Sequence, residues 1–505
     1  METNTKNLIS KIPKEVSHVT QTLEKGGFEA YLVGGCVRDL IMGKGPKDWD
    51  ITTNANPDQI MGLFEKTVYE NTFGTVGVCV PCETPNPDVI RETPEYEIIE
   101  VTPYRIEAKY SDFRHPDEIR FSDKLEDDLK RRDFTVNALA LNSKGQLVDI
   151  FDGLKDIKDK VLRAVGNGDD RFNEDALRML RAVRFSCRLN FSLSQETYES
   201  ILKNSDLIKK ISPERIRDEF VKIINSENPS AGILLLQKFG LLKNIIPEME
   251  EGIGCEQGGE HIYDVWNHLL MACQHAADKK WPFEIRLAAL FHDIGKPRSR
   301  RLSESKTKKK YTFYGHEVIG ARMSEKIMER LKFPKKEIDL VEKMVRNHMF
   351  FSDTELITLS AVRRIIAKVG VENIWLLMNI RECDRVGMKK KEAPYRLRKY
   401  FAMIEEALRD PISVGQLKVN GEYLIKDMKI APGPRMGWIL HALLEEVLED
   451  PSKNTVDELS KLVLSLNKLS DTELKALGDK AKERKEELEE KEVEKLHSKH
   501  GVRKF

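Results

Sequence analysis

The stretch YLVGGCVRDLIMGKGPKDWDITT, residues 31–53, decides the fold of the N-terminal part of this chain. A short apolar run leads into two glycines, and a helix is expected from Cys36 to Met42. Asp48 and Asp50 follow, and on a strand they would point to the same face, because side chains alternate along a strand. Two carboxylates on one face repel each other unless a cation lies between them. Hard oxygen ligands of this kind suit Mg²⁺, and a two-metal clamp serves phosphoryl transfer. A polar β-turn is the bland alternative.

The surroundings of this acidic pair favour the metal interpretation. Gly34 and Gly35 precede the expected helix, where free backbone N–H groups can bind phosphate. Arg38 follows closely and can pair with a triphosphate through two hydrogen bonds. A third acid is available in the strand-like run EIIEVTPYR, where Glu100 is the first choice and Glu97 competes with it.

The texture of the chain changes near residue 160. Residues 28–150 alternate short β-like runs with turns, whereas periodic apolar patterns typical of helices continue almost to the end. The expected fold class is therefore α+β, with an α/β head built on a mostly β mixed sheet and an extended all-α body. Breaks between helices are expected near four turn-rich sites: Gly166–Asp170, Ser226–Pro229, Gly252–Gly259 and Asp410–Pro411.

Composition sets the broad class of protein. The chain has 505 residues, of which 33% are charged and 40% hydrophobic. It contains no run of about 18 apolar residues and its first residues have no apolar signal core, so we expect a cytoplasmic protein without membrane contact. The seven cysteines are scattered, and the pair Cys79 and Cys82 has no partner pair at zinc spacing, which favours reduced thiols. The formal net charge is zero, so any basic surface must be local.

Further motifs occur in a fixed order. They are YSDFRHPDEIRF (110–121), RRDFTVNALA (131–140), EDALRMLRAVRF (174–185) and PERIRDEF (213–220). Together with GGCVRD and DWDITT they resemble the nucleotidyltransferase superfamily, in the branch that contains bacterial CCA-adding enzymes and bacterial poly(A) polymerases. The resemblance runs from about residue 28 to about residue 445.

This resemblance implies an activity and a set of ligands. Asp48 and Asp50 would hold two Mg²⁺ ions, with Glu100 as the third catalytic acid. An RNA 3′-hydroxyl, that of a tRNA 3′ end, would attack the α-phosphate of CTP or ATP, and pyrophosphate would leave. Catalysis would consist mostly of positioning and charge neutralisation. The sequence indicates no oligomeric state.

The same resemblance implies how the nucleotide is chosen. Asp133 would accept a hydrogen bond from the ribose 2′-hydroxyl, and Asn137 would help to hold the sugar. Asp175 and Arg178, three apart on an expected helix, would present a protein edge that accepts C and A and disfavours G and U. The alternative for this pair is a surface salt bridge. The expected nucleotide-binding residues are Gly34, Gly35, Arg38, Arg132, Asp133, Asn137, Asp175, Arg178, Arg181 and Arg184.

A second constellation lies at residues 263–386. His268, the doublet His292-Asp293 and Asp384 stand in the order H…HD…D, which resembles the HD phosphohydrolase domain, and His316 and His348 lie nearby as extra histidines. Imidazole and carboxylate groups from separate helices can converge on a divalent metal and activate a water molecule. We therefore expect a second divalent metal at these four residues, of a kind that the sequence does not specify.

These interpretations divide the chain into five parts. They are a catalytic head at 1–155, a helical neck at 156–255, an HD domain at 256–400, a C-terminal helical RNA-binding body at 401–470 and a charged C-terminal helix at 471–505. Basic runs at 296–310 and 389–399 are candidates for phosphate contacts, although each is equally well explained as a solvated loop. The segment 420–440, with its Pro-Gly-Pro turn, is a candidate contact to the tRNA elbow, and Trp438 is expected in the core.

Three rival functions remain open at this point. A poly(A) polymerase shares the head motifs but usually lacks the HD signature and carries a basic tail. A partial enzyme would add only CC or only A. A non-catalytic RNA-binding protein would not need the acids at positions 48, 50, 175, 293 and 384.

Overall fold

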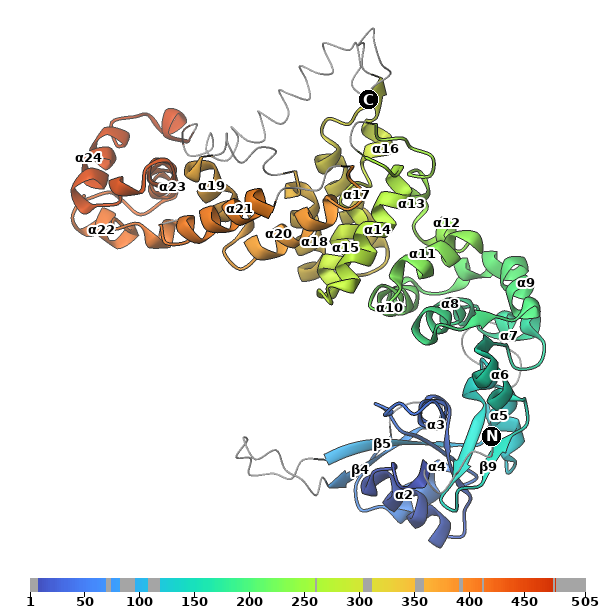
Figure 1. Ribbon diagram of the computed structural model, residues 1–505. Helices are drawn as coiled ribbons and strands as arrows, with labels where there is room; N and C mark the ends of the chain where they lie inside the picture. Colours follow the sequence, from blue (N-terminus) through green and yellow to red (C-terminus); the bar gives the residue numbers. More distant parts are fainter. Residues whose placement is uncertain are drawn as a thin grey trace. The chain divides into compact units, whose positions relative to one another are not determined.

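The computed structural model divides into two compact units, Met1–Ile245 and Ile246–Phe505 (Figure 1). The residues that the structure describes are 8–69, 74–81, 96–107, 119–258, 261–302, 311–349, 358–389, 394–410, 413–475 and 477.

A seven-stranded mixed sheet forms the centre of the first unit. Its order is β3-β4-β5-β2-β1-β8-β9. Strands β2 and β5 are parallel and place Asp50 opposite Glu100, whereas the other neighbours are antiparallel. The strands are β1 (Ala30–Val33), β2 (Asp50–Thr53), β3 (Thr67–Tyr69), β4 (Val76–Pro81), β5 (Tyr96–Pro103), β8 (Leu139–Asn142) and β9 (Leu147–Asp149). A separate hairpin pairs β6 (Arg105–Glu107) with β7 (Ile119–Phe121).

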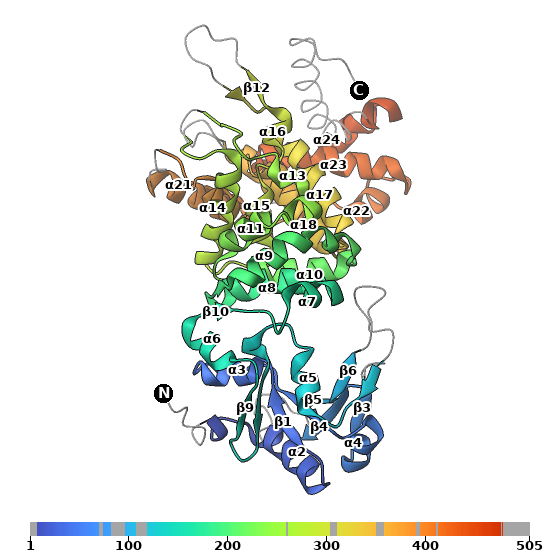
Figure 2. The same ribbon diagram turned by 90° about the vertical axis from the view of Figure 1, so that its right-hand side faces the viewer.

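Two helices cover one face of this sheet. Helix α2 (Lys14–Lys25) contacts β1, β4 and β5, and α4 (Pro57–Leu63) contacts β4 and β5 (Figure 2). The core between them buries alternate residues of the strands, such as Ile51 and Val101. Because Ile51 and Val101 face this core, their neighbours Asp50 and Glu100 point to the opposite face. The helix expected at 36–42 is α3 (Gly35–Ile41).

The rest of the first unit is helical. It confirms the expected change of texture near residue 160, apart from a two-residue parallel pairing of β10 (Val161–Leu162) with β11 (Ser192–Leu193). The helices are α5 (Leu125–Lys130), α6 (Gly153–Asp159), α7 (Gly168–Glu174), α8 (Leu177–Leu189), α9 (Gln195–Asn204), α10 (Pro213–Ile224), α11 (Pro229–Lys238) and α12 (Leu242–Ile245). The break expected at Ser226–Pro229 separates α10 from α11, where Pro229 is the first residue of the new helix.

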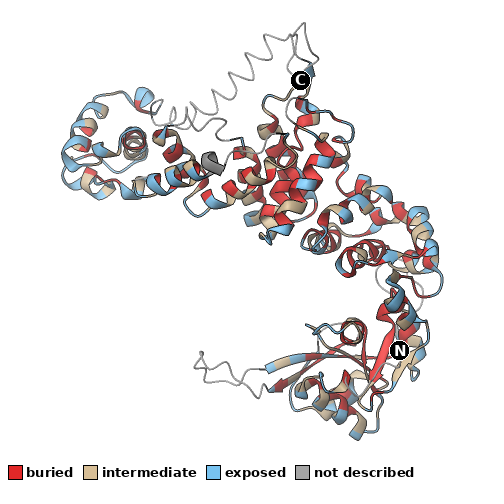
Figure 3. Ribbon diagram, viewed as in Figure 1, coloured by how far each residue is buried: buried red, intermediate tan, exposed pale blue. Residues whose placement is uncertain are grey.

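The second unit begins with a bundle of packed helices. Helices α14, α15, α17, α18 and α20 contact one another, and their inward faces are buried (Figure 3). The helices of this part are α13 (Pro247–Glu250), α14 (Val265–Asp278), α15 (Phe283–Phe291), α16 (Lys296–Ser299), α17 (His316–Arg330), α18 (Lys335–Asn347), α19 (Leu359–Val369), α20 (Ile374–Asp384) and α21 (Pro394–Ala407). A short antiparallel pair, β12 (Arg301–Leu302) and β13 (Tyr311–Thr312), interrupts the all-α pattern.

A smaller apolar core holds the C-terminal helices together. Leu424, Leu443 and Val463 are buried in it, one from each of three helices. These are α22 (Gly421–Lys426), α23 (Pro434–Glu449) and α24 (Val456–Leu466). Trp438 packs against the same core, as expected. The charged helix expected from residue 471 lies mostly outside the described residues.

The structure confirms the expected fold class of a mixed-sheet head followed by a helical body. Among the described residues, no helix is both long enough and apolar enough to cross a bilayer.

Candidate nucleotide site and candidate metal centre

Asp50 is the first residue of β2, and it lies beside Glu100 of β5. Burial raises the pKa of the Asp50 carboxyl, Arg132 opposes this shift, and the charge of Asp48 adds to it. Asp48 and Asp50 therefore influence each other electrostatically, and the strand pairing places Glu100 next to Asp50. Glu97, the competing third acid, lies on the other face of β5, because it is an odd number of residues from Glu100.

The expectation that Asp48 and Asp50 share a strand is wrong for Asp48. Residue 48 is exposed in a bend, and β2 begins two residues later. The prolines and glycines of KGPKD do not support an extended ladder before that point. Asp48 thus approaches Asp50 from a loop and is free of the geometric constraint of a sheet.

Gly34 brings the chain close to Asp50. Its φ of 81° is in the left-handed region, and a Cβ at this position would lie 2.9 Å from Nη1 of Arg132 and 3.8 Å from Oδ2 of Asp50. Arg132 in turn donates to the buried Asp128 at 3.1 Å. A glycine is required here, both for its backbone conformation and for the close approach of these side chains.

Behind the turn, a chain of hydrogen bonds links four expected site residues. Arg38 is only 2% exposed; its Nη1 donates to Asn137 at 2.6 Å and its Nε to Asp39 at 2.8 Å. Asn137 donates through Nδ2 to Asp133 at 3.1 Å. Arg181 donates through Nε to the other oxygen of Asp133 at 2.8 Å. Arg38 is thus already engaged by protein groups, so its contact with a triphosphate stays a prediction.

Asp133 is ionised in these surroundings. Burial by itself would raise its pKa, but the ion pair with Arg181 and the hydrogen bond from Asn137 outweigh burial and bring the pKa to about 2. A permanently charged acceptor fits the expected contact with a ribose hydroxyl. The same charge also ties α8 to the loop that carries Asp133.

The expectation that Asp175 and Arg178 share one helix is wrong. Asp175 ends α7 in an extended conformation (φ −142°, ψ 102°), and α8 begins at Leu177. The short side chain of Asp175 instead accepts from the Leu177 amide at 3.0 Å, which is a local capping interaction that competes with a helix. Arg178 lies in the first turn of α8, 9% exposed.

Each of these two residues has protein partners. Arg178 donates to Oε2 of Glu174 at 2.5 Å and to the carbonyl oxygen of Arg131 at 2.9 Å. Asp175 accepts from Arg215 of α10 at 2.7 Å. Arg184, the last expected residue of this site, pairs with Glu219 at 3.1 Å. Helices α8 and α10 thus bring together the expected site residues Asp175, Arg178 and Arg184. Arg215 belongs to the same site; the sequence did not predict it, although it lies in the PERIRDEF motif.

The histidines and aspartates of the second unit meet in a buried cluster. His268 lies on α14, His292 and Asp293 directly follow α15, and Asp384 ends α20. Nε2 of His268 and Nε2 of His292 are 3.0 Å apart, and both lie 3.4–3.5 Å from Oδ2 of Asp293. The ligand atoms of all four residues lie within 4.8 Å of one another. Among the described residues, groups this tight with three or more such atoms occur only here, so metal binding by the more open acids of the head stays a prediction.

A second group shares Asp293 with the first. Nε2 of His316 lies 3.2 Å from Oδ1 of Asp293, and Nε2 of His348 lies 3.5 Å from the same oxygen. The histidines of the first group are closer to the other oxygen, Oδ2. Both carboxylate oxygens of Asp293 are buried; Oδ1 has no hydrogen-bond partner among the described residues, whereas Oδ2 lies beside Nζ of Lys296. A buried carboxylate that faces ring nitrogens on two sides fits a bridge between two cations.

The orientation of the rings supports the same conclusion. The Nδ1 atoms of the four histidines face backbone carbonyl oxygens at 2.6–3.0 Å. A carbonyl can only accept, so each Nδ1 carries the proton and each Nε2 lone pair is directed into the cluster. The carbonyls belong to Val386, Ala289, Phe313 and Val345.

A histidine with a raised pKa and a lysine lie beside the acids of the cluster. Burial alone would lower the pKa of His292, but Asp293 and Asp384 outweigh it and raise the pKa to about 10. Nζ of Lys296 lies 2.5 Å from Oδ2 of Asp293 and donates to Gln257 at 2.6 Å. Lys296 is therefore buried, which is at variance with its inclusion in an RNA-facing basic run.

The rest of that basic run is only partly described. Arg298 forms a two-point ion pair with Glu251, and the guanidinium of Arg300 lies over the ring of Tyr311. Residues 303–310 lie outside the described residues, as do Lys390 and Lys391 of the second run. Phosphate contacts by these segments stay a prediction.

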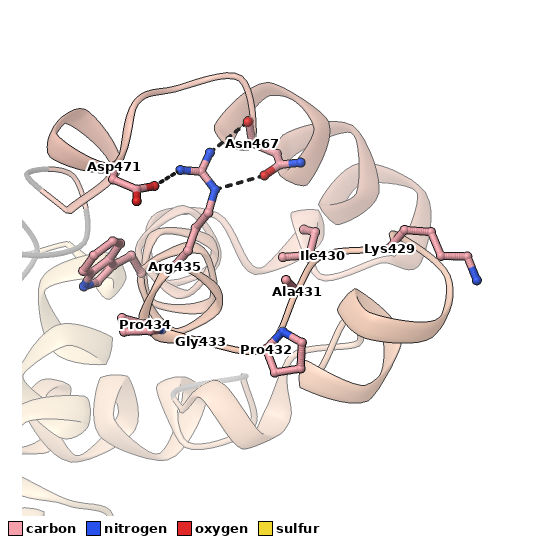
Figure 4. A pocket seen from close by; sticks show the side chains of 10 residues that line it. Lys429, Ile430, Ala431, Pro432, Gly433, Pro434, Arg435, Asn467 and Asp471 are labelled. Atoms are coloured by element: carbon pink, nitrogen blue, oxygen red, sulfur yellow. Dashed lines mark hydrogen bonds and ion pairs between the residues drawn. The ribbon is translucent and has the colours of Figure 1, made fainter.

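The Pro-Gly-Pro turn of the C-terminal helices borders a pocket (Figure 4). Gly433 precedes α23, and Pro434 is its first residue. Arg435 points away from the turn and donates to the carbonyl oxygens of Asn467 and Leu469, both at 2.8 Å, and to Asp471. Its guanidinium thus ties α23 to the end of α24. A contact between this turn and RNA stays a prediction.

Comparison with known protein families accounts for most of the chain. A model described as "Poly A polymerase head domain" matches residues 30–163. A model described as "Probable RNA and SrmB- binding site of polymerase A" matches residues 190–253, and one described as "HD domain" matches residues 258–393. The head-domain match contains the Asp50 site, and the HD match contains the whole His/Asp cluster.

Curated relatives match somewhat less than half of the chain. The CCA-adding enzyme of Lactobacillus delbrueckii subsp. bulgaricus is 47% identical over 216 residues, which is 43% of this chain and 51% of the relative. The CCA-adding enzyme of Ligilactobacillus salivarius is 45% identical over 230 residues, 45% of this chain and 54% of the relative. The chain thus spans about half the length of these relatives.

Solved structures resemble the chain over a greater length. The Bacillus stearothermophilus CCA-adding enzyme, solved in complex with CTP, is 26% identical with a TM-score of 0.64 and covers 90% of this chain and 97% of its own. The Thermotoga maritima CCA-adding enzyme, solved with tRNA, has a TM-score of 0.52 and shares the fold at 19% identity over 91% of this chain and 98% of its own.

Proposed function

We propose that this protein adds C, C and A to the 3′ end of tRNA, with CTP and ATP as substrates and without a nucleic-acid template. The observation that carries the proposal is the pairing of Asp50 with Glu100 on one face of a poly A polymerase head domain. The names of its relatives support the choice of CCA addition over other nucleotidyl transfers.

The head residues suit this reaction. Asp48, Asp50 and Glu100 offer the hard carboxylate oxygens that Mg²⁺ prefers, and bound Mg²⁺ would supply charge neutralisation at the phosphates. Burial raises the pKa of Asp50 and the charge of Asp48 adds to the shift, and a bound cation would offset both effects. The RNA 3′-oxygen forms a bond to the α-phosphorus, and the bond to pyrophosphate breaks.

The chain's other residues bind and orient the nucleotide. The turn at Gly34 and Gly35 would place backbone N–H groups near the triphosphate, with Arg132 beside them. Asp133 would accept from the ribose, and Asn137 and Arg181 hold its carboxylate in place. Asp175 and Arg178 would read the base, the first as an acceptor and the second as a donor.

One experiment separates this function from its rivals. Transcripts of a tRNA that end in the discriminator base, in C or in CC are incubated with each NTP alone and with all four. Ordered growth that stops at CCA is expected. Unlimited A-tailing of unrelated RNA would instead identify a poly(A) polymerase, and growth that stops at CC would identify a partial enzyme.

We infer a second function for the HD domain, a metal-dependent hydrolysis of phosphate esters. Four inward-facing Nε2 atoms and the two buried oxygens of Asp293 contribute to two adjoining groups of ligands. Divalent cations held there would supply an activated water molecule and polarise a phosphate. The ligand set of four imidazoles and two carboxylates fits a transition metal better than Mg²⁺.

Metal content tests this second function. In a background that carries both Asp48→Ala and Asp50→Ala, so that the head cannot contribute, the protein is loaded with Mn²⁺, desalted and assayed. Two equivalents per chain are expected. His348→Ala should lose one of them, whereas His441→Ala, which removes an exposed histidine of α23, should lose none. A single equivalent that His348→Ala leaves in place would show that only the H…HD…D group binds.

A further inference from the structure

Asp175, the expected acceptor for the base, is held by an arginine from another helix. Nη2 of Arg215 lies 2.7 Å from Oδ2 of Asp175, and Nη1 lies 3.3 Å from Oδ1. Both side chains are largely buried, with 22% and 17% of their surfaces exposed. A guanidinium that approaches both oxygens fixes the plane of the carboxylate as well as its position.

Little else in the structure sets the direction of this carboxylate. Asp175 belongs to neither α7 nor α8, and its backbone is extended. Its carboxylate also accepts a hydrogen bond from the amide of Leu177, at 3.0 Å. One amide fixes one oxygen and leaves rotation about that contact, so the two-point contact from Arg215 determines which way Asp175 faces.

Arg215 itself is presented by a well-anchored element. It lies on α10 (Pro213–Ile224), which packs against α8. One turn further on, Glu219 of α10 pairs with Arg184 of α8 at 3.1 Å, and these side chains are only 4% and 10% exposed. Residues 215 and 219 share a face of the helix, so one face of α10 holds both Arg184 of α8 and the carboxylate of Asp175, two residues before α8 begins.

Arg178, the other residue expected to read the base, is also held by protein groups. Arg178 donates to Glu174 and to the Arg131 carbonyl, and it does not rely on the nucleotide for its orientation. Asp175 and Arg178 are therefore oriented before a base arrives, which lowers the entropic cost of binding.

We propose that Arg215 is a positioning residue that sets the base selectivity of this protein by fixing the carboxylate of Asp175. This inference rests on the proposed nucleotide addition. Each carboxylate oxygen has two acceptor sites, so Asp175 can hold Arg215 and still accept the exocyclic amine of C or A. U and G present a carbonyl at that position, and a fixed carboxylate rejects them because its charge would face an acceptor. A carboxylate that can turn away loses that power of rejection.

The test compares nucleotide selectivity in full-length variants. Wild type, Arg215→Ala and Arg215→Lys are given a tRNA transcript without CCA and single NTPs, and kcat and KM are measured for CTP and UTP. Arg215→Ala should lower the ratio of kcat/KM for CTP over UTP by about tenfold or more, a size expected when one hydrogen-bonded discriminator is loosened. Arg215→Lys keeps the charge but not the two-point contact, and it should fall between the two.

A matched control comes from the same helix. Arg217 lies two residues away and pairs with its neighbour Asp218 at 2.8 Å, away from the base edge. Arg217→Ala should leave the ratio within about twofold of the wild type. Melting temperatures are recorded for all variants, and if Arg215→Ala does not fold, Arg215→Gln takes its place.

The outcomes separate the inference from the proposed function. A wild type that adds neither C nor A to tRNA overturns the proposed function and the inference with it. An active wild type whose Arg215 variants lose kcat/KM equally for CTP and UTP overturns the inference alone, because that is the pattern of a merely structural ion pair. A loss confined to the ratio supports it.

Discussion

The head site and the His/Asp centre both gather acids, but they neutralise them in different ways. In the head, arginines accompany the acids: Arg132 beside Asp50, and Arg181 on Asp133. In the HD domain, Asp293 faces four imidazoles and one lysine. A guanidinium is always charged and cannot coordinate a metal, whereas a neutral imidazole can.

The difference shows what completes each site. Asp48 and Glu100 are exposed, and the acids and arginines of the head lie at the surface of a sheet, where an anionic nucleotide and its cations can enter together. The His/Asp centre is buried, and its lone pairs already converge, so a metal alone satisfies it. The head therefore depends on its substrate for completion, and the HD centre does not. If the two sites are independent, a substitution that inactivates one site should leave the activity of the other unchanged.

The largest expected effect comes from removing the acid at the centre of the head. Asp50→Ala should reduce nucleotide addition by about 10³-fold or more, because positioning and charge neutralisation at the phosphates both depend on it. Metal content and phosphatase activity of the HD domain should stay at the wild-type level. Both are measured on the same preparation, with a generic phosphate ester for the HD domain.

Reciprocal and matched variants sharpen this test. His292→Ala should remove one equivalent of metal from the HD domain and leave nucleotide addition intact. Asp58→Asn, which removes an exposed acid from the first turn of α4, should change neither activity. A loss of both activities on a single substitution would contradict two independent sites.

A second expected effect is smaller and concerns only the geometry of the head. Gly34→Ala would place a methyl group 2.9 Å from Nη1 of Arg132 at a φ of 81°. Arg132 or the turn must move, and a displacement of about 1 Å at such a site costs on the order of 10²-fold in rate. Steady-state addition of C to a tRNA transcript measures the loss.

Gly45→Ala is the matched control for this change. Gly45 lies between α3 and β2, beyond the helix that Gly34 precedes, and a Cβ there would meet nothing within 4 Å. Gly45→Ala should retain nearly full activity. Equal losses in the two variants would mean that any methyl group added in this part of the chain lowers activity, whether or not it approaches Arg132.

Local patterns in the sequence predicted the elements of both sites, but not the pairings between them. The helix after Gly34 and the strand at Asp50 follow from apolar periodicity, and the structure has both. The HD spacing gave four residues that the structure brings together. Periodicity carries no information about contacts between distant positions, such as the ion pair of Arg215 with Asp175, 40 residues apart.

Two predictions that the structure contradicts show the same limit of reasoning from local sequence patterns. Asp175 fits a helical spacing with Arg178, but its side chain competes for the Leu177 amide and the helix begins later. Lys296 belongs to a basic run by composition, yet Asp293 and Gln257 draw it into the interior. In each case a specific polar partner overrode the statistical preference of the segment.

The smallest expected effect concerns stability in the head and follows from the lowered pKa of Asp133. A carboxyl with a pKa of about 2 in the folded state, against about 3.9 in the unfolded chain, stabilises the fold by about 2.6 kcal/mol at neutral pH. Since the folded-state pKa is the lower one, this stabilisation is complete above about pH 4 and is lost as the pH falls toward 2. Asp133→Asn removes the charge, so it should lower the free energy of unfolding by about that amount at pH 7 and by progressively less below pH 4. Denaturant titrations of both proteins at pH 7, 5 and 3 measure the difference in their free energies of unfolding, taken from the transition whose midpoint the substitution shifts.

The HD centre should respond to pH in a different way. Protonation of its imidazoles at low pH should release metal there, while the difference in unfolding free energy caused by Asp133→Asn should be the same at pH 7 and pH 5. A difference between the two proteins that stays constant down to pH 3 would show that Asn137 and Arg181 hold Asp133 by shape alone, and that its charge contributes nothing to the stability of the head.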